Sequence, residues 1–187
     1  FNPSNSSSKP KVLYDRNYQD IYSDPGSFLK ARNTFNKSVL LLHKGNAYLR
    51  GAGFSKEGQF PFIDRLNITT LNKSRVYQSK YTNKVEAIQD YNPSTNELIV
   101  RIESPTEYPN YYSKKTKGKK LSKITDFENP FEELQNVKKE VITYKRDDGL
   151  ELSGILYLPV NYDEEKKEKA PMILWAYPRE FKDRNSA

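Results

Sequence analysis

His43 is the only histidine of the chain, and cysteine is absent. The lack of cysteine excludes disulfide scaffolds, thiolate zinc sites and a cysteine nucleophile. A single histidine further limits metal and acid–base chemistry, so we expect no metal site and no cofactor. As a general base, His43 would need a nucleophile and an orienting carboxylate nearby, and no motif beside it offers either. We therefore interpret His43 as a polar residue at the end of a predicted strand, Ser38–His43 (SVLLLH).

Serine catalysis on an α/β-hydrolase scaffold has its own signature, Gly-x-Ser-x-Gly followed by an Asp and then a His. No Gly-x-Ser-x-Gly occurs in the chain. The glycines Gly51, Gly53 and Gly58 lack the spacing of a dinucleotide-binding loop, and no helix pattern follows them. These residues therefore predict neither a nucleophile nor a nucleotide site within the chain itself.

A basic tract, Lys114–Lys123 (KKTKGKKLSK), accounts for most of the formal net charge of +7. Such a tract is typical either of a solvated hairpin turn, here around Gly118, or of a phosphate-binding patch. We favour the turn, because the nearby Tyr108, Tyr111 and Tyr112 fit strands better than base-stacking platforms. We accordingly expect no nucleic-acid partner.

The overall composition predicts a folded, strand-rich chain. Aromatic residues make up 13%, although hydrophobic residues reach only 35%; a disordered chain would be poor in aromatics. No apolar run approaches the ~20 residues of a membrane-spanning helix. Alternating apolar and polar residues between turn signals predict strands at Lys11–Asn17, Ser38–His43, Ala47–Gly53, Phe60–Ile68, Ser74–Ser79, Val85–Tyr91, Glu97–Glu103, Asn110–Lys115 and Leu121–Thr125.

The predicted strands recur in two groups. Ser38 and Val85 open corresponding segments, and Arg75 and Ser122 are separated by the same offset, between forty and fifty residues. Two consecutive four-stranded antiparallel units with this period are typical of β-propeller blades. A β-sandwich whose strands recur by chance fits the pattern equally well.

The character of the sequence changes after Phe127. Residues 128–139 form a predicted linker with at most one helical turn. A hairpin follows, with strands at Glu140–Arg146 and Leu150–Leu158. Pro171–Tyr177 (PMILWAY) is a continuous apolar run, as expected of a strand buried on both faces of an α/β sheet.

Three stretches together resemble the prolyl oligopeptidase family of serine peptidases, in its glutamyl endopeptidase-like branch. They are Glu103–Tyr112, Ile124–Pro159 and Leu174–Phe181. The resemblance implies a mainly β fragment: the C-terminal part of a β-propeller at 1–127, a linker at 128–139, and the truncated N-terminal part of an α/β-hydrolase domain at 140–187.

The resemblance also implies a function for the parent protein. It would hydrolyse peptides by acyl transfer, with the propeller gating access to the hydrolase site. Because the family's triad follows the third hydrolase strand, Ser, Asp and His are expected beyond Ala187, and the fragment alone is predicted to be inactive. The expected partners are a peptide substrate and the rest of the hydrolase domain, with no membrane span. Family habit and the cysteine-free composition predict a periplasmic or secreted protein, with a cytoplasmic one as the alternative.

Two residues are candidates for the chemistry under this resemblance. Tyr177 ends the third predicted hydrolase strand, at the place where relatives use a tyrosine hydroxyl as an oxyanion donor. The alternative is that Tyr177 packs at the strand end. Arg179 is a candidate for gripping an acidic substrate side chain, since arginine pairs with carboxylates through two hydrogen bonds. The alternative function, from a different class, is a non-catalytic β-propeller or β-sandwich binding module.

Overall fold

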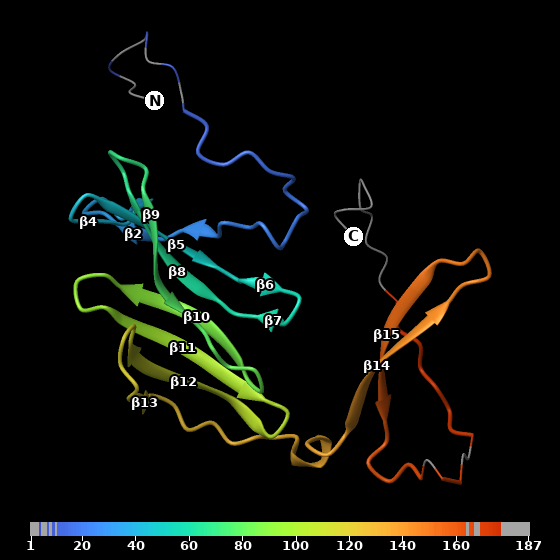
Figure 1. Cartoon of the computed structure of the whole chain (residues 1–187). Helices are drawn as coiled ribbons and strands as arrows, with labels where there is room; N and C mark the ends of the chain where they lie inside the picture. Colours follow the sequence, from blue (N-terminus) through green and yellow to red (C-terminus); the bar gives the residue numbers. More distant parts are fainter. Residues whose placement is uncertain are drawn as a thin grey trace. The chain divides into compact units, whose positions relative to one another are not determined.

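The computed structural model describes residues 4, 7, 9, 11–163, 165, 166 and 169–176. Strands β1 to β15 dominate, and within this described part the only helical element is a 3-10 turn, η1 (Glu132–Leu134) (Figure 1). The prediction of a mainly β, antiparallel chain is confirmed. The described residues form two compact units: a first unit running to Ser104 and resuming at Pro109–Phe127, and a second holding Pro105–Tyr108 and the residues from Glu128 onward.

The first sheet of the first unit has five strands instead of the four expected. Its order is β1 (Ser27–Phe28), β5 (Asn46–Gly51), β8 (Phe62–Asn67) and β9 (Lys73–Gln78), and β4 (Leu42–His43) pairs with β5. All of these pairs are antiparallel. Two short hairpins accompany the sheet: β2 (Lys30–Arg32) with β3 (Ser38–Leu40), and β6 (Phe54–Ser55) with β7 (Gly58–Gln59).

The predicted strand Ser38–His43 is interrupted in the structure. Its first half, β3, pairs with β2, while its second half, β4, pairs with β5. At the break, the Leu41 N–H donates to the Leu29 carbonyl at 2.9 Å. The chain then reverses through Lys44 and Gly45, both at positive φ, as a two-residue hairpin turn requires.

The second sheet follows the chain without a crossover. Strands β10 (Val85–Asn92), β11 (Glu97–Ser104), β12 (Glu107–Lys115) and β13 (Leu121–Lys123) lie in sequence order. A bulge between Ile88 and Asp90 shifts the register of β10 against β11. This meander has the four strands that the alternating pattern predicted.

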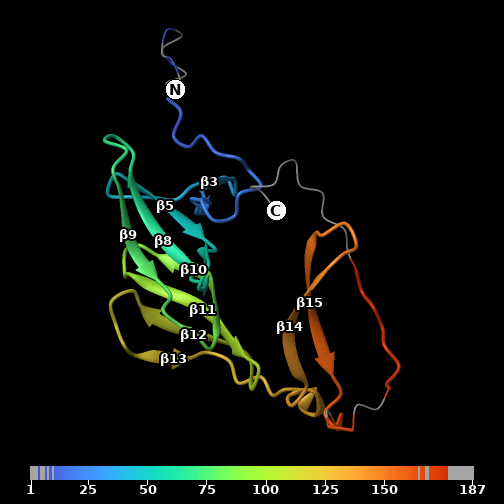
Figure 2. The same cartoon turned by 45° about the vertical axis from the view of Figure 1, so that its right-hand side comes forward.

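The two sheets of the first unit lie next to each other (Figure 2). They share one hydrophobic core. The rings of Tyr48 and Tyr91, one from each sheet, lie 5.4 Å apart. The Arg50 guanidinium also crosses from the first sheet to the second, where it donates to the carbonyls of Ile88 at 3.0 Å and Gln89 at 2.5 Å. Burial of each large apolar side chain contributes roughly 1.5–3 kcal/mol. The buried members are Tyr48, Ile63, Tyr77, Ile88, Tyr91, Leu98, Val100 and Ile102.

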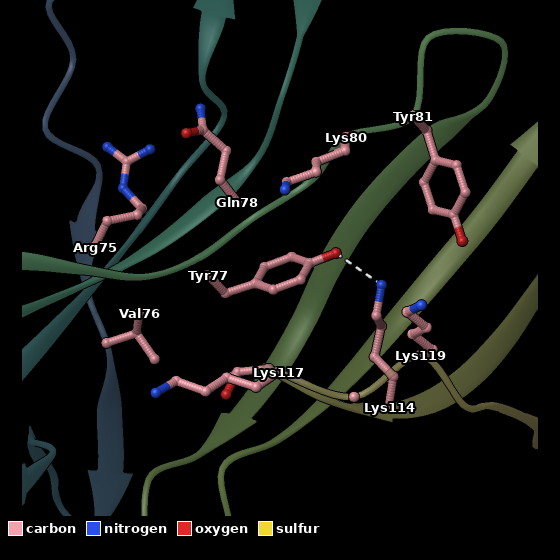
Figure 3. A pocket seen from close by; sticks show the side chains of 11 residues that line it. Arg75, Val76, Tyr77, Gln78, Lys80, Tyr81, Lys114, Lys117 and Lys119 are labelled. Carbon is pink, nitrogen blue, oxygen red and sulfur yellow. Dashed lines mark hydrogen bonds between the residues drawn. The ribbon is translucent and has the colours of Figure 1, made fainter.

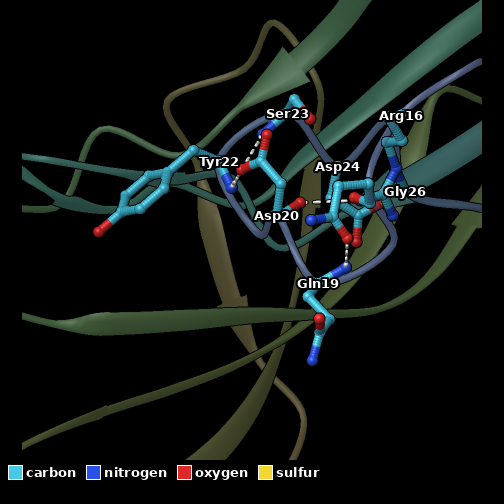
Figure 4. Close-up of polar contacts among 8 residues, drawn as sticks. Arg16, Gln19, Asp20, Tyr22, Ser23, Asp24 and Gly26 are labelled. Carbon is cyan, nitrogen blue, oxygen red and sulfur yellow. Dashed lines mark hydrogen bonds and ion pairs between the residues drawn. The ribbon is translucent and has the colours of Figure 1, made fainter. Parts of the chain in front are cut away.

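The segment before β1 is irregular, although Lys11–Asn17 was predicted as a strand. Its polar side chains bind nearby backbone groups (Figure 4). The Asp20 carboxylate accepts the N–H groups of Tyr22 and Ser23, and the Asp24 carboxylate accepts the Gly26 N–H and the Arg16 guanidinium. Hydrogen bonds to Ser23, first that of its side chain, lower the pKa of Asp20. Such local bonds favour turns over a strand ladder in the residues that follow the predicted strand.

The second unit is built on one hairpin. Strands β14 (Lys138–Lys145) and β15 (Glu151–Leu158) pair antiparallel over their whole length, and neither carries a buried side chain. The predicted strand Pro171–Tyr177 is not a strand over its described part, 171–176. Ile173 is 95% exposed there. An apolar strand needs neighbours to pair with and a cover on each face, and the described residues supply neither.

No helix in the described part of the chain is long and apolar enough to cross a membrane.

Candidate functional site

The two residues predicted to touch the chemistry, Tyr177 and Arg179, lie outside the described residues. Their roles as oxyanion donor and substrate contact therefore stay predictions. His43 ends β4, and its Nδ1 lies 3.5 Å from the Ser94 hydroxyl, a long and solvent-exposed contact. A working nucleophile–base pair is shorter and has a third group that orients the base. No described carboxylate contacts His43, which supports its interpretation as a polar residue at a strand end.

A cleft lies between the two sheets of the first unit. It consists of two adjoining cavities of about 670 Å³ and 570 Å³, and both are lined by Arg75 and Val76 of β9 and by Thr116 and Lys117 after β12. Figure 3 shows the larger cavity, with Tyr77 pointing from β9 toward Lys114 of the second sheet. We call the two cavities together the inter-sheet cleft.

A closed polar network forms one wall of the inter-sheet cleft. The Lys114 ammonium donates to the Tyr77 hydroxyl at 2.8 Å and to a Glu86 carboxylate oxygen at 3.2 Å. The Tyr77 hydroxyl in turn donates to the other Glu86 oxygen at 2.5 Å. The side chains of Glu86 and Lys114 are only 0% and 13% exposed, so the carboxylate is buried together with its counter-charge. Burial, followed by the hydrogen bond to Glu86, raises the pKa of Tyr77 far above its usual range.

The burial of Lys114 corrects our interpretation of the basic tract. We interpreted the tract as a solvated hairpin turn around Gly118, although the predicted strand Asn110–Lys115 already included Lys114. In the structure Lys114 belongs to β12, and its ammonium lies over the rings of Tyr77 and Tyr81. Strand alternation already contained the signal, because Lys114 shares the parity of Tyr112, which packs against the core. The tract's composition concealed this parity.

A second buried carboxylate lies in the first sheet. Asp64 is 1% exposed and forms ion pairs with Arg75 and, at 3.5 Å, with Lys73. The Arg75 guanidinium also stacks 3.9 Å from the centre of the Phe62 ring. The pairing leaves Arg75 held in place at the edge of the inter-sheet cleft.

Asn110 fixes the end of the first unit. Its side-chain oxygen accepts the Phe127 N–H at 2.7 Å and the Thr125 hydroxyl at 2.8 Å, and its side-chain nitrogen donates to the Phe127 carbonyl at 3.1 Å. The rings of Tyr111 and Phe127 pack edge to face, 6.5 Å apart. The sequence offered no signal for these hydrogen bonds, because Asn110, Thr125 and Phe127 belong to no recognisable motif.

Among the described residues, no three His, Asp or Glu side chains gather where they could hold a metal ion.

Comparisons with known proteins place this chain near two plant proteins. No family model matches the chain. Over alignments that cover all of it, the chain is 36% identical to a "Probable glutamyl endopeptidase, chloroplastic" of Oryza sativa subsp. japonica and 34% identical to the protein of the same name from Arabidopsis thaliana. This chain is related to peptidases. It spans about a fifth of those relatives, 21% of each.

Solved structures add little to this relationship. The isopeptidase AtxE2, with Astexin3-dC4 bound and in its apo form, aligns to 79% and 73% of the chain with TM-scores of 0.37 and 0.35. The identities are 15% and 17%, and the alignments cover 24% and 22% of the isopeptidase chains. The two plant relatives are named as chloroplastic, so the expectation of a periplasmic or secreted protein has no support from them.

Proposed function

We propose that residues 1–187 belong to a serine peptidase of the prolyl oligopeptidase family, in which a β-propeller precedes an α/β-hydrolase domain. The observation that carries the proposal is the 36% and 34% identity over the whole chain to proteins named as glutamyl endopeptidases. The limited share of those relatives that the chain spans is consistent with a part of a longer enzyme.

The fold supports the proposed domain organisation. Two antiparallel sheets that follow each other in sequence and stack on one core are what neighbouring propeller blades provide. Residues 1–127 would be the C-terminal part of the propeller, 128–139 the linker, and 140–187 the start of the hydrolase domain. The uncovered hairpin β14–β15 and the exposed apolar run after Pro171 are consistent with a sheet that the rest of the hydrolase domain completes.

The chemistry would be acyl transfer to a serine in the rest of the hydrolase domain. A His would take the serine proton, and an Asp would orient the His. Negative charge then develops on the substrate carbonyl oxygen, and preset hydrogen-bond donors stabilise it. Within this chain we assign that role to the Tyr177 hydroxyl, and we assign Arg179 to the acidic side chain of the peptide substrate.

A fluorophosphonate probe tests the serine mechanism. The full-length protein should be labelled stoichiometrically, while the 187-residue chain should remain unlabelled because it carries no activated serine. Labelling of any serine within residues 1–187 would contradict the proposal. A full-length protein that neither reacts nor cleaves Glu-containing peptides would favour the alternative, a non-catalytic binding module.

Substitution of Tyr177 tests the oxyanion assignment separately. In the full-length enzyme, Tyr177→Phe should lower kcat by ~10²–10³ with little change in KM, because the hydroxyl acts only on the transition state. Arg179→Lys should instead raise KM for Glu-containing peptides, since lysine cannot form the paired hydrogen bonds. A Tyr177→Phe enzyme with the original kcat would reduce Tyr177 to a packing role.

A further inference from the structure

The inter-sheet cleft gathers cationic side chains, and most of them have no carboxylate partner. Its larger cavity is lined by the five cations Arg75, Lys80, Lys114, Lys117 and Lys119 and by no carboxylate. The carboxylates that neutralise two of them, Asp64 with Arg75 and Glu86 with Lys114, are buried and do not line the cavity. In contrast, Lys80, Lys117 and Lys119 form no ion pair with any described residue.

The smaller cavity extends the same charge. It adds Lys44, Arg65 and Lys115, again with no carboxylate in its lining. Only Lys115 among these three has an ion-pair partner in the described part, Glu97 at 3.6 Å. A cleft lined by one sign of charge focuses its field and raises the local concentration of an oppositely charged ligand. Because a single exposed ion pair contributes little to binding, a ligand must meet several of these cations at once.

The edge strand β9 indicates how such a ligand would lie. β9 is the last strand in the order of its sheet, so its outer backbone groups pair with no other described strand. Four consecutive residues of β9, Arg75–Gln78, line the larger cavity, which therefore follows the strand (Figure 3). An extended peptide can add to such an edge through main-chain hydrogen bonds. Its alternate side chains would then reach the lysines that follow β12.

The tyrosines of the cleft argue against a nucleic-acid ligand. Single-stranded nucleic acids need aromatic faces on which bases can stack. The rings of Tyr48, Tyr77 and Tyr91 are instead buried in the core. The Tyr81 ring already has the Lys114 ammonium over it, 5.6 Å from the ring centre, so this ring is not a free stacking surface either.

We propose that the inter-sheet cleft binds an extended acidic peptide segment as an added strand along β9, with its carboxylates paired to Lys80, Lys117 and Lys119. This site lies entirely within the first unit. It involves none of the residues assigned to the peptidase chemistry, so it can be tested whether or not that chemistry is confirmed.

Binding can be measured by fluorescence anisotropy on the 187-residue chain. The probe is a fluorescein-labelled peptide of alternating Glu and Val, and its control replaces every Glu by Gln. We expect the Glu probe to bind at least about tenfold tighter than the Gln probe, and added salt to weaken it through screening. The double variant Lys117→Gln, Lys119→Gln should bind the Glu probe about fivefold or more weakly. The matched variant Lys30→Gln, Lys37→Gln changes two exposed lysines outside the cleft and should bind within about twofold of the original.

Three results would overturn the proposal. Equal binding of the Gln probe would show that charge does not select the ligand. Equal weakening by both double variants would mean that net charge acts, not the cleft. Displacement of the peptide by inorganic tripolyphosphate or an oligothymidylate at lower concentrations than by unlabelled peptide would assign the site to phosphate polyanions. Circular dichroism of each variant confirms that the β structure is retained.

Discussion

The two units differ in what covers their apolar side chains. In the first unit, two sheets face each other, and Ile63, Leu98 and Val100 are fully buried. In the second unit, exposure alternates along β15, but even its less exposed face, with Leu156 and Leu158, holds no buried side chain, and Ile155 on the other face is 61% exposed. Alternation thus sets which face is apolar, but burial requires a second layer. The first unit carries its own second layer, whereas the second unit depends on a layer that the described residues do not contain.

The largest effect is expected when a buried charge is removed from the first unit. Glu86→Gln leaves the Lys114 ammonium without its counter-charge in the wall between the sheets, and should lower the free energy of unfolding by about 3–5 kcal/mol. Urea unfolding followed by circular dichroism measures the loss. The double variant Glu86→Leu, Lys114→Met removes both charges and should recover most of it. A single variant as stable as the original chain would mean that the network contributes little.

Matched truncations compare the two units directly. Ile63→Ala in the shared core should cost roughly 2–5 kcal/mol, because it leaves a cavity between packed sheets. Ile155→Ala on the open hairpin should change the stability by less than about 0.5 kcal/mol. The same urea titration measures both. Equal costs would contradict the difference in burial on which the comparison rests.

Alkaline pH should destabilise the first unit through Tyr77. Its pKa is raised by burial and by Glu86, so the folded state keeps the phenol proton at a pH where the unfolded chain, with an ordinary pKa near 10, releases it. The stabilisation is complete below about pH 10 and is lost as pH rises above that value, by up to about 1.4 kcal/mol per pH unit for one tyrosine. In the Tyr77→Phe variant, the free energy of unfolding should fall less steeply with pH above about pH 10, by up to about 1.4 kcal/mol per pH unit. An unchanged slope would show that Tyr77 does not titrate differently on folding.

A local loss of stability is expected at the turn of the second unit's hairpin. Gly149 has φ of +84°, so Gly149→Ala should destabilise the hairpin turn by about 1 kcal/mol. Gly154→Ala is the control, because a methyl group there would lie 3.8 Å from the Ile142 side chain, an ordinary van der Waals contact. Amide hydrogen exchange across β14 and β15 reports the change. Equal exchange in both variants would rule out strain at the turn.

Local pattern predicted the parts of the fold that depend on neighbours in sequence. The meander β10–β13 needs only short connections, and alternation located it well. The split of Ser38–His43 between two hairpins was missed because it depends on Leu29, which accepts from Leu41 across a turn. Pro171–Tyr177 has the composition of a buried strand, but composition does not supply the neighbouring strands.

The candidate sites divide in the same way. Alternation could have placed Lys114 in the wall of the cleft, since its parity is that of a core residue. The sequence showed the basic tract that holds Lys117 and Lys119. Its meeting with Lys80 could not be predicted, because the two sides of the cavity come together only after the sheets stack. Tyr177 and Arg179 remain predictions from family resemblance.

The shared core also has a consequence for synthesis on the ribosome. Ile63 of the first sheet leaves the ribosome before Ile102 of the second, which belongs to the same core, and about forty residues separate them. At roughly 5–20 residues per second, the first sheet waits about 2–8 seconds for its cover. We expect chains stalled after β9 to be cleaved readily by added protease, and chains stalled after β13 to resist it. The apolar face of the first sheet thus stays uncovered until the second sheet is made. A chaperone has those seconds in which to bind it.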